Sequence, residues 1–201
     1  MTERLPCIDC GALILPDTAA RNGGLCMPCK GGYRKSIGEG KLRREEARRY
    51  EKSAERQYWR ALVDRVYKQA GGFAALGASE RTYWAVNCLS GEVYNGGFYQ
   101  FFSNSTGELY ELALEGLVEM GATHSAGQLR RVKELFFGAG HVPADEAARN
   151  AILPALEYFE SSLKEMAASL DAIEEEFYAD PDELAQRCAA YAAKHGLYDA
   201  D

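Results

Sequence analysis

Hydrophobic residues recur at helical spacing through most of the chain after residue 40, and no stretch alternates as a half-buried strand would. Residues 41–69 contain no Pro or Gly and carry one apolar stripe at steps of three and four residues. The stripe consists of Ala47, Tyr50, Ala54, Tyr58, Leu62 and Val66. The pattern predicts one long helix with a charged opposite face, ended by Gly71 and Gly72.

Shorter apolar-periodic segments follow this helix and are separated by helix breakers. They predict helices near 79–93, 97–103, 107–120, 126–137, 145–178 and 182–195. We expect Ser79 to cap the first segment and Pro154 to kink or interrupt the fifth. Asp180 and Pro181 should start the last. The fold class predicted for residues after the N-terminal cysteines is therefore all-α.

The least regular stretch is residues 93–104, with the sequence VYNGGFYQFFSN. Its Asn-Gly-Gly triplet permits positive φ and should break the preceding helix, while Phe98, Phe101 and Phe102 form one face of the next turn. We interpret it as a helix–helix corner plugged by aromatic rings, with Gln100 and Asn104 hydrogen-bonded to exposed backbone ends. Alternatively, these two amides and the glycine backbone receive a ligand.

Four of the six cysteines form two CxxC pairs, Cys7 with Cys10 and Cys26 with Cys29. This spacing is typical of a tetrahedral four-thiolate zinc site, because each CxxC turn delivers two sulfurs. Disulfides are the alternative, and they are rare in the reducing cytoplasm. A catalytic zinc is disfavoured, since four cysteines leave no position for water. We therefore expect a structural Zn²⁺ cofactor.

The predicted domains are a zinc-ribbon module at 1–35, a charged connector helix at 36–72 and an acidic helical domain at 73–201. The 201-residue chain has a formal charge of −7, but the charge is divided unevenly. Residues 1–70 hold 15 Lys and Arg against 9 Asp and Glu, whereas residues 71–201 hold 8 against 21. Because DNA and RNA bind mainly through cations that neutralise phosphates, any nucleic-acid contact belongs to residues 1–70.

Several carboxylates of the C-terminal part are candidates for binding a basic partner. Four of them recur at steps of three and four residues and should share one side of a helix. Such a row carries about one charge per ~5.5 Å, compared with one per ~3.4 Å along a DNA strand. A solubilising surface is the alternative interpretation. The candidates are Glu108, Glu111, Glu115, Glu119, Glu174, Glu175, Glu176, Asp180, Asp182 and Glu183.

No catalytic motif is present in the sequence, and the three histidines lie far apart without metal-ligand spacing. We therefore expect a non-enzymatic protein. No apolar stretch is long enough to span a membrane, and residues 1–20 lack the apolar segment of a secretory signal. These features predict a cytoplasmic protein without a membrane partner.

Residues 91–108 (GEVYNGGFYQFFSNSTGE), together with SERTYWAVNCLSGE upstream and LDAIEEEFY at 170–178, resemble the bacterial DNA-mimic protein family. The resemblance covers about residues 75–195. It implies an acidic all-helical domain, commonly dimeric, whose carboxylates occupy the DNA-binding surface of a transcription factor. The positions that carry the family motif, most of which should hold the fold, are Asn95, Gly96, Gly97, Phe98, Gln100, Phe101, Phe102, Asn104 and Gly107.

Together these patterns predict a regulatory binding protein whose acidic domain engages a basic DNA-binding protein and competes with DNA. The alternative is a nucleic-acid-binding module that uses the zinc ribbon and the helix from Lys41 to Arg60. In that case the helical domain serves for dimerisation or as a protein-interaction scaffold. Mimicry requires the surplus carboxylates to lie on one exposed patch that arginines of the same chain do not neutralise.

Overall fold

The computed structural model of the chain describes residues 3–154 and 161–199. The chain divides into two compact units, Met1–Arg56 and Gln57–Asp201, which we describe separately. Helices dominate the described residues, and the strands found there are two residues long each. The predicted all-α class is therefore confirmed. None of the described helices is long and apolar enough to cross a membrane.

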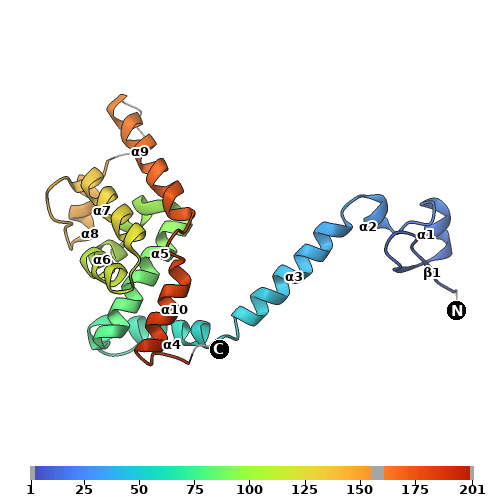
Figure 1. Cartoon of the computed structure of the whole chain (residues 1–201), viewed down its shortest axis with the longest axis horizontal. Coiled ribbons are helices and arrows are strands. Elements are labelled where there is room, and N and C mark those ends of the chain that lie inside the picture. The colour runs from blue at the N-terminus through green and yellow to red at the C-terminus, as the bar shows by residue number, and fades with distance from the viewer. Residues whose placement is uncertain (1–2, 155–160, 200–201) are drawn as a thin grey trace. The chain divides into compact units, whose positions relative to one another are not determined.

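The first unit opens with a small hairpin in which β1 (Leu5–Pro6) pairs antiparallel with β2 (Leu13–Ile14). Two short helices follow, α1 (Pro16–Arg21) and α2 (Met27–Lys30), and each has a proline in its first turn. The unit then continues into the helix α3 (Arg34–Tyr50) (Figure 1). None of the residues of α3 is buried. The short elements thus have little apolar core of their own.

The single helix predicted over residues 41–69 is wrong, because the structure has two helices there. α3 ends at Tyr50, and α4 (Ala54–Lys68) begins after a turn. The Ser53 hydroxyl donates to the Tyr50 carbonyl at 2.8 Å and accepts from the Arg56 N–H at 3.2 Å. Ser53 therefore satisfies a backbone group on each side of the break, as a serine N-cap does.

The second unit is a bundle of helices around one hydrophobic core (Figure 1). After α4 and the 3₁₀ turn η1 (Gly72–Ala75), its longest helix is α5 (Ala78–Ser103). The remaining elements are η2 (Ser105–Leu109), α6 (Tyr110–Glu119), α7 (Thr123–Phe137), α8 (Glu146–Ile152), α9 (Ser161–Tyr178) and α10 (Leu184–Lys194). Helix α8 ends before Pro154, so the expected interruption of the fifth segment is confirmed.

The start of α5 corrects the expected cap at Ser79. The helix begins one residue earlier, and the Glu80 carboxylate accepts the Gly77 N–H at 2.9 Å. Arg65 of α4 holds the same carboxylate through both terminal nitrogens, one of them at 2.8 Å. Because Glu80 satisfies the free backbone donor, no serine cap is needed at this end.

The expected helix break at Asn95-Gly96-Gly97 is confirmed inside α5. Gly96 and Gly97 have non-helical backbone angles, and Gly97 takes φ 75°. A Cβ at Gly97 would lie 2.2 Å from Glu174 Oε1 of α9, which accepts the Phe98 N–H at 2.8 Å. The kink turns Phe98, Phe101 and Phe102 into the core, where all three are fully buried. The aromatic plug expected from the sequence is thus present.

Arg149 of α8 is a fully buried cation that joins α8 to the end of α5. Its guanidinium donates to the carbonyls of Phe102 at 2.9 Å and Asn104 at 2.6 Å. It also donates to the carbonyls of Pro143 at 2.9 Å and Ala144 at 2.7 Å. Because the last carbonyls of a helix lack partners and carry partial negative charge, a cation there stabilises the helix end.

Candidate metal centre, acidic row and pocket

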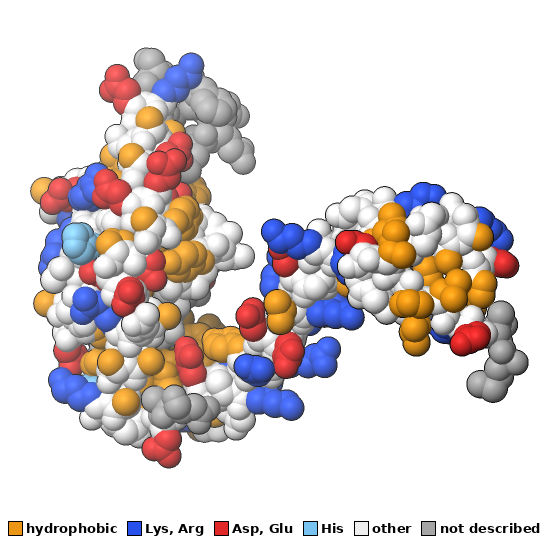
Figure 2. Space-filling view, turned by 45° about the vertical axis from the view of Figure 1, so that its right-hand side comes forward, with side chains coloured by type: hydrophobic (Ala, Val, Ile, Leu, Met, Phe, Trp, Pro, Cys, Tyr) orange, Lys and Arg blue, Asp and Glu red, His pale blue; other side chains and the backbone are white. Residues whose placement is uncertain are grey.

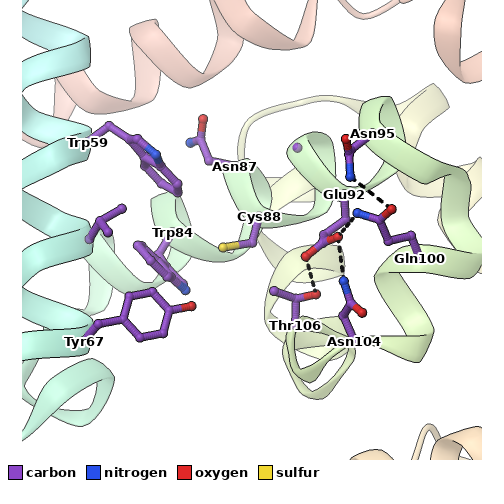
Figure 3. Close-up of a pocket in the computed structure, with 12 residues that line it drawn as sticks. Trp59, Tyr67, Trp84, Asn87, Cys88, Glu92, Asn95, Gln100, Asn104 and Thr106 are labelled. Carbon is purple, nitrogen blue, oxygen red and sulfur yellow. Dashed lines mark hydrogen bonds between the residues drawn. The ribbon is translucent and has the colours of Figure 1, made fainter.

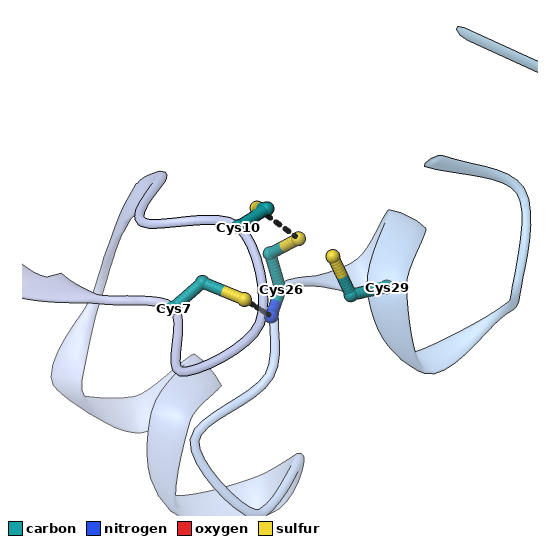
Figure 4. Close-up of side chains that lie close together, drawn as sticks. All are labelled: Cys7, Cys10, Cys26 and Cys29. Atoms are coloured by element: carbon teal, nitrogen blue, oxygen red, sulfur yellow. Dashed lines mark hydrogen bonds between the residues drawn. The ribbon is translucent and has the colours of Figure 1, made fainter. Parts of the chain in front are cut away.

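The four cysteines predicted to bind zinc come together in the first unit. Cys7 and Cys10 lie between β1 and β2, Cys26 precedes α2, and Cys29 lies within it. Their sulfur atoms all lie within 4.8 Å of one another (Figure 4). The Cys10 and Cys26 sulfurs are 3.7 Å apart, close to the ~3.8 Å edge of a tetrahedron with ~2.3 Å metal–sulfur bonds. All four thiols are free, and their arrangement fits a metal ion.

Hydrogen bonds around the cysteines favour the thiolate form of Cys7 and Cys26, whose pKa values are lowered. Arg34 Nη2 donates to the sulfurs of Cys10 at 2.9 Å and Cys26 at 3.0 Å. The Cys26 N–H donates to Cys7 Sγ at 3.2 Å and lowers the pKa of Cys7 to about 6. The sequence reasoning missed Arg34, whose only signal is a cation placed shortly after the last cysteine. Such outer groups orient and stabilise metal-binding thiolates.

Four of the ten candidate carboxylates form a row on the surface of the second unit. Glu108 lies in η2, and Glu111, Glu115 and Glu119 lie in α6 at steps of four residues. All four side chains are exposed, while α6 buries Tyr110, Ala113, Gly116 and Leu117. Among residues 3–154 and 161–199, no Lys or Arg forms an ion pair with any member of the row, but His195 Nε2 lies 3.7 Å from Glu119 Oε1.

The other six candidates do not extend this row into one continuous patch. Asp182 is 4% exposed and accepts the Ser125 N–H at 2.7 Å. The expectation that Asp182 binds a partner at the surface is therefore wrong. Asp180 accepts the Leu184 N–H, and Glu174 accepts the Phe98 N–H inside the bundle. Burial raises the pKa of Glu174. Each of these three carboxylates accepts a backbone N–H of its own chain at a helix start or at the kink in α5.

The remaining three lie at the surface in different settings. Glu176 pairs with Arg131 at 2.5 Å, whereas Glu175 and Glu183 are exposed. On the face of the second unit seen in Figure 2, acidic side chains are interspersed with hydrophobic and neutral ones. The expectation of one patch therefore reduces to the row from Glu108 to Glu119.

A pocket of about 420 Å³ lies in the second unit, between α4, α5 and η2 (Figure 3). The Glu92 carboxylate accepts hydrogen bonds from Asn104 Nδ2 at 2.9 Å and Thr106 Oγ1 at 3.3 Å. Gln100 Nε2 also donates to it, and Asn95 Nδ2 donates to Gln100 Oε1 at 3.1 Å. The expected bonds from Gln100 and Asn104 to backbone ends are thus corrected, because their amide groups bind Glu92.

All the motif positions except Gly96 fall into two sets in the structure. Asn95, Gln100 and Asn104 line the pocket, while Gly97 and the three phenylalanines are buried. Gly96 is exposed. Gly107 is buried beside Arg149, where a Cβ would lie 2.6 Å from Nε. Glu92 was missed because the kink at Gly96 and Gly97 removes the regular spacing that would link it to its amides. Arg149 was missed because the carbonyls of Phe102 and Asn104 that it binds lie far away in the sequence.

Comparison with known proteins identifies one segment of the chain. A family model described as DMP19-like protein matches residues 74–195. No curated protein and no solved structure matches the chain. The matched segment runs from η1 to the end of α10 and contains the acidic row, the kinked motif and the buried Arg149.

Proposed function

This chain belongs to the DMP19-like protein family, and on that premise we propose that its helical body acts as a DNA mimic. In this proposal the carboxylates of η2 and α6 occupy the DNA-binding surface of a basic protein, such as a transcription factor, and compete with DNA. The protein needs no catalytic group for this role. Association is steered by charge and weakens as salt screens it.

The row from Glu108 to Glu119 is the observation that carries the proposal. Within α6 its charges follow one another at about 6 Å, since four residues rise 1.5 Å each. No Lys or Arg described in the structure offsets this charge by an ion pair. Two cations of the same body, Arg149 and Arg187, bind backbone carbonyls instead. Glu119 lies 3.7 Å from His195 Nε2, so Glu108, Glu111 and Glu115 are the members of the row left to attract cations of a partner.

We also propose that Cys7, Cys10, Cys26 and Cys29 hold a structural Zn²⁺. Four thiolates around one Zn²⁺ give a net charge of −2, and the Arg34 guanidinium beside two of the sulfurs offsets part of it. When bound, the ion cross-links the hairpin to α2, which substitutes for an apolar core in so small a unit.

A second candidate function is nucleic-acid binding through residues 1–70. The observation that favours it is α3, which buries none of its residues and carries Lys and Arg along its length (Figure 2). Two of these cations, Lys35 and Arg49, pair with glutamates one turn away. Arg34 contacts the cysteine sulfurs, whereas Lys41, Arg43, Arg44 and Arg48 are exposed and available to phosphates. In this case the helical body would serve for dimerisation or as a scaffold.

Elution from immobilised DNA separates these two functions. Basic proteins of a native lysate are bound to DNA–cellulose, and the full chain is added as the eluant. Under the mimic proposal the chain itself passes through at about 50 mM salt and releases a DNA-binding protein that buffer alone at the same salt leaves on the column. Retention of the chain on DNA–cellulose without lysate, together with no released protein, would instead support the second candidate.

A charge-matched pair of variants tests the row itself. The first variant replaces the four row glutamates, Glu108, Glu111, Glu115 and Glu119, with glutamine. The control makes the same change in charge at exposed positions outside the row: Glu134→Gln, Glu146→Gln, Glu165→Gln and Asp171→Asn. We expect the first variant to release no protein and the control to behave as the wild type. Equal release by both variants would refute the role of the row.

A further inference from the structure

The pocket around Glu92 carries a carboxylate that forms no ion pair with any Lys, Arg or His of the described residues. Its lining contains no Lys, Arg or His, and the Glu92 carboxylate accepts hydrogen bonds from the neutral side chains of Gln100, Asn104 and Thr106. Neutral donors orient a carboxylate without cancelling its charge. The pocket is therefore suited to a cationic ligand and unsuited to a phosphate or another anion.

Aromatic rings form the opposite wall of the pocket (Figure 3). Trp59 and Trp84 stack with centroids 4.9 Å apart, and Tyr67 meets Trp84 edge-on at 6.0 Å. Tyr67 is 70% exposed, so its ring is open to a ligand. The face of an aromatic ring attracts cations, and a planar guanidinium can stack on it as well.

The thiol in the pocket argues against a metal or a covalent ligand there. Burial raises the pKa of Cys88 to about 12, so this side chain stays a neutral thiol. The recognition groups that remain are the rings on one side and a carboxylate surrounded by amides on the other. A guanidinium satisfies both, because it stacks on an aromatic face and donates a fork of N–H bonds to carboxylate and amide oxygens.

We propose that this pocket binds the guanidinium group of an arginine side chain presented by the partner protein. The proposal rests on the mimic function, since a DNA-binding partner exposes arginines on the surface that the body would cover. In this arrangement the acidic row attracts the partner through charge, and the pocket anchors it through one side chain. Buried arginine anchors of this kind are common hot spots of protein interfaces.

Tryptophan fluorescence reports directly on this pocket, because both tryptophans of the sequence line it. The full chain is titrated with acetyl-Gly-Arg-Gly-amide and, separately, with the same peptide carrying citrulline, the neutral isostere of arginine. We expect a saturable change with the arginine peptide and a dissociation constant about ten-fold higher, or more, with citrulline. Equal affinity for both peptides, or no response to arginine, would overturn the proposal.

Gly91 offers a variant that closes the pocket without disturbing its hydrogen bonds. It lines the pocket, and a Cβ built there meets no atom within 4 Å. Gly91→Leu should therefore keep the melting temperature and lose the response to the arginine peptide. Gly38→Leu, at an exposed position of α3 that is equally open, is the control and should respond as the wild type. A response that persists in Gly91→Leu would place binding elsewhere and refute the proposal.

The peptide titration and the DNA–cellulose elution fail independently. If the arginine peptide binds but no DNA-binding protein is released, the pocket is an arginine site and the proposal of DNA mimicry is refuted. If the peptide does not bind, and Gly91→Leu releases the DNA-binding protein as well as the wild type does, mimicry is supported. The proposal that the pocket anchors the partner is then refuted.

Discussion

Replacing Arg149 with methionine should destabilise the helical body strongly. The side chain is fully buried, and four of its hydrogen bonds to backbone carbonyls are 2.9 Å or shorter. Methionine fills a similar volume but leaves those carbonyls without a donor, at a cost of about 1 kcal/mol each. We therefore expect the free energy of unfolding to fall by about 4 kcal/mol, a large part of the ~5–15 kcal/mol typical of a domain.

Urea titration followed by far-UV circular dichroism and tryptophan fluorescence measures this loss. The control is Arg130→Met, because Arg130 is exposed on α7 and its replacement should change stability by less than about 0.5 kcal/mol. A loss below about 1 kcal/mol for Arg149→Met would show that water or other groups replace the guanidinium. In that case the hydrogen bonds of Arg149 would not be what holds α8 to the end of α5.

Three further predictions concern other contacts. Hydrogen bonding from Arg65 lowers the pKa of Glu80 from its ordinary value, so the stabilising effect of this carboxylate is lost as pH falls through the lowered pKa. Urea titrations should show Glu80→Gln less stable than the wild type near neutral pH, with a gap that narrows in acid. Gly97→Ala should cost about 1–3 kcal/mol because its φ of 75° is strained for alanine, and a calorimetric scan measures this. Elemental analysis should find about one zinc per chain and little in Cys10→Ser, while chelation should unfold residues 1–35 and leave the body helical by circular dichroism.

Local rules predicted much of the fold. Apolar spacing located the helices after residue 78, and the break at Gly96 and Gly97 follows from the freedom of glycine at positive φ. The cysteine cluster was equally accessible, since CxxC turns bring sulfurs together by geometry alone. In each case the residues that determine the feature lie close together in the sequence.

The missed features depend on partners far apart in the sequence. Arg149 meets the Phe102 carbonyl 47 positions away, and Asp182 meets the Ser125 N–H 57 positions away. Spacing places a charged residue on a helix face, but it does not show whether another helix end needs that charge. The break between α3 and α4 was missed for a different reason. Ser53 is the only residue in the sequence that marks it, and a single serine is also compatible with a continuous helix.

Helix α4 has a consequence for where this protein can be cut. It lies before residue 74, outside the segment that matches the family, yet Leu62 is fully buried in the body and Trp59 stacks on Trp84. A polypeptide trimmed to the family segment would uncover that side of the core and lose one wall of the cavity beside Glu92. The family segment therefore begins at residue 74, whereas the folded body begins with α4. Truncations intended to stay folded should retain α4.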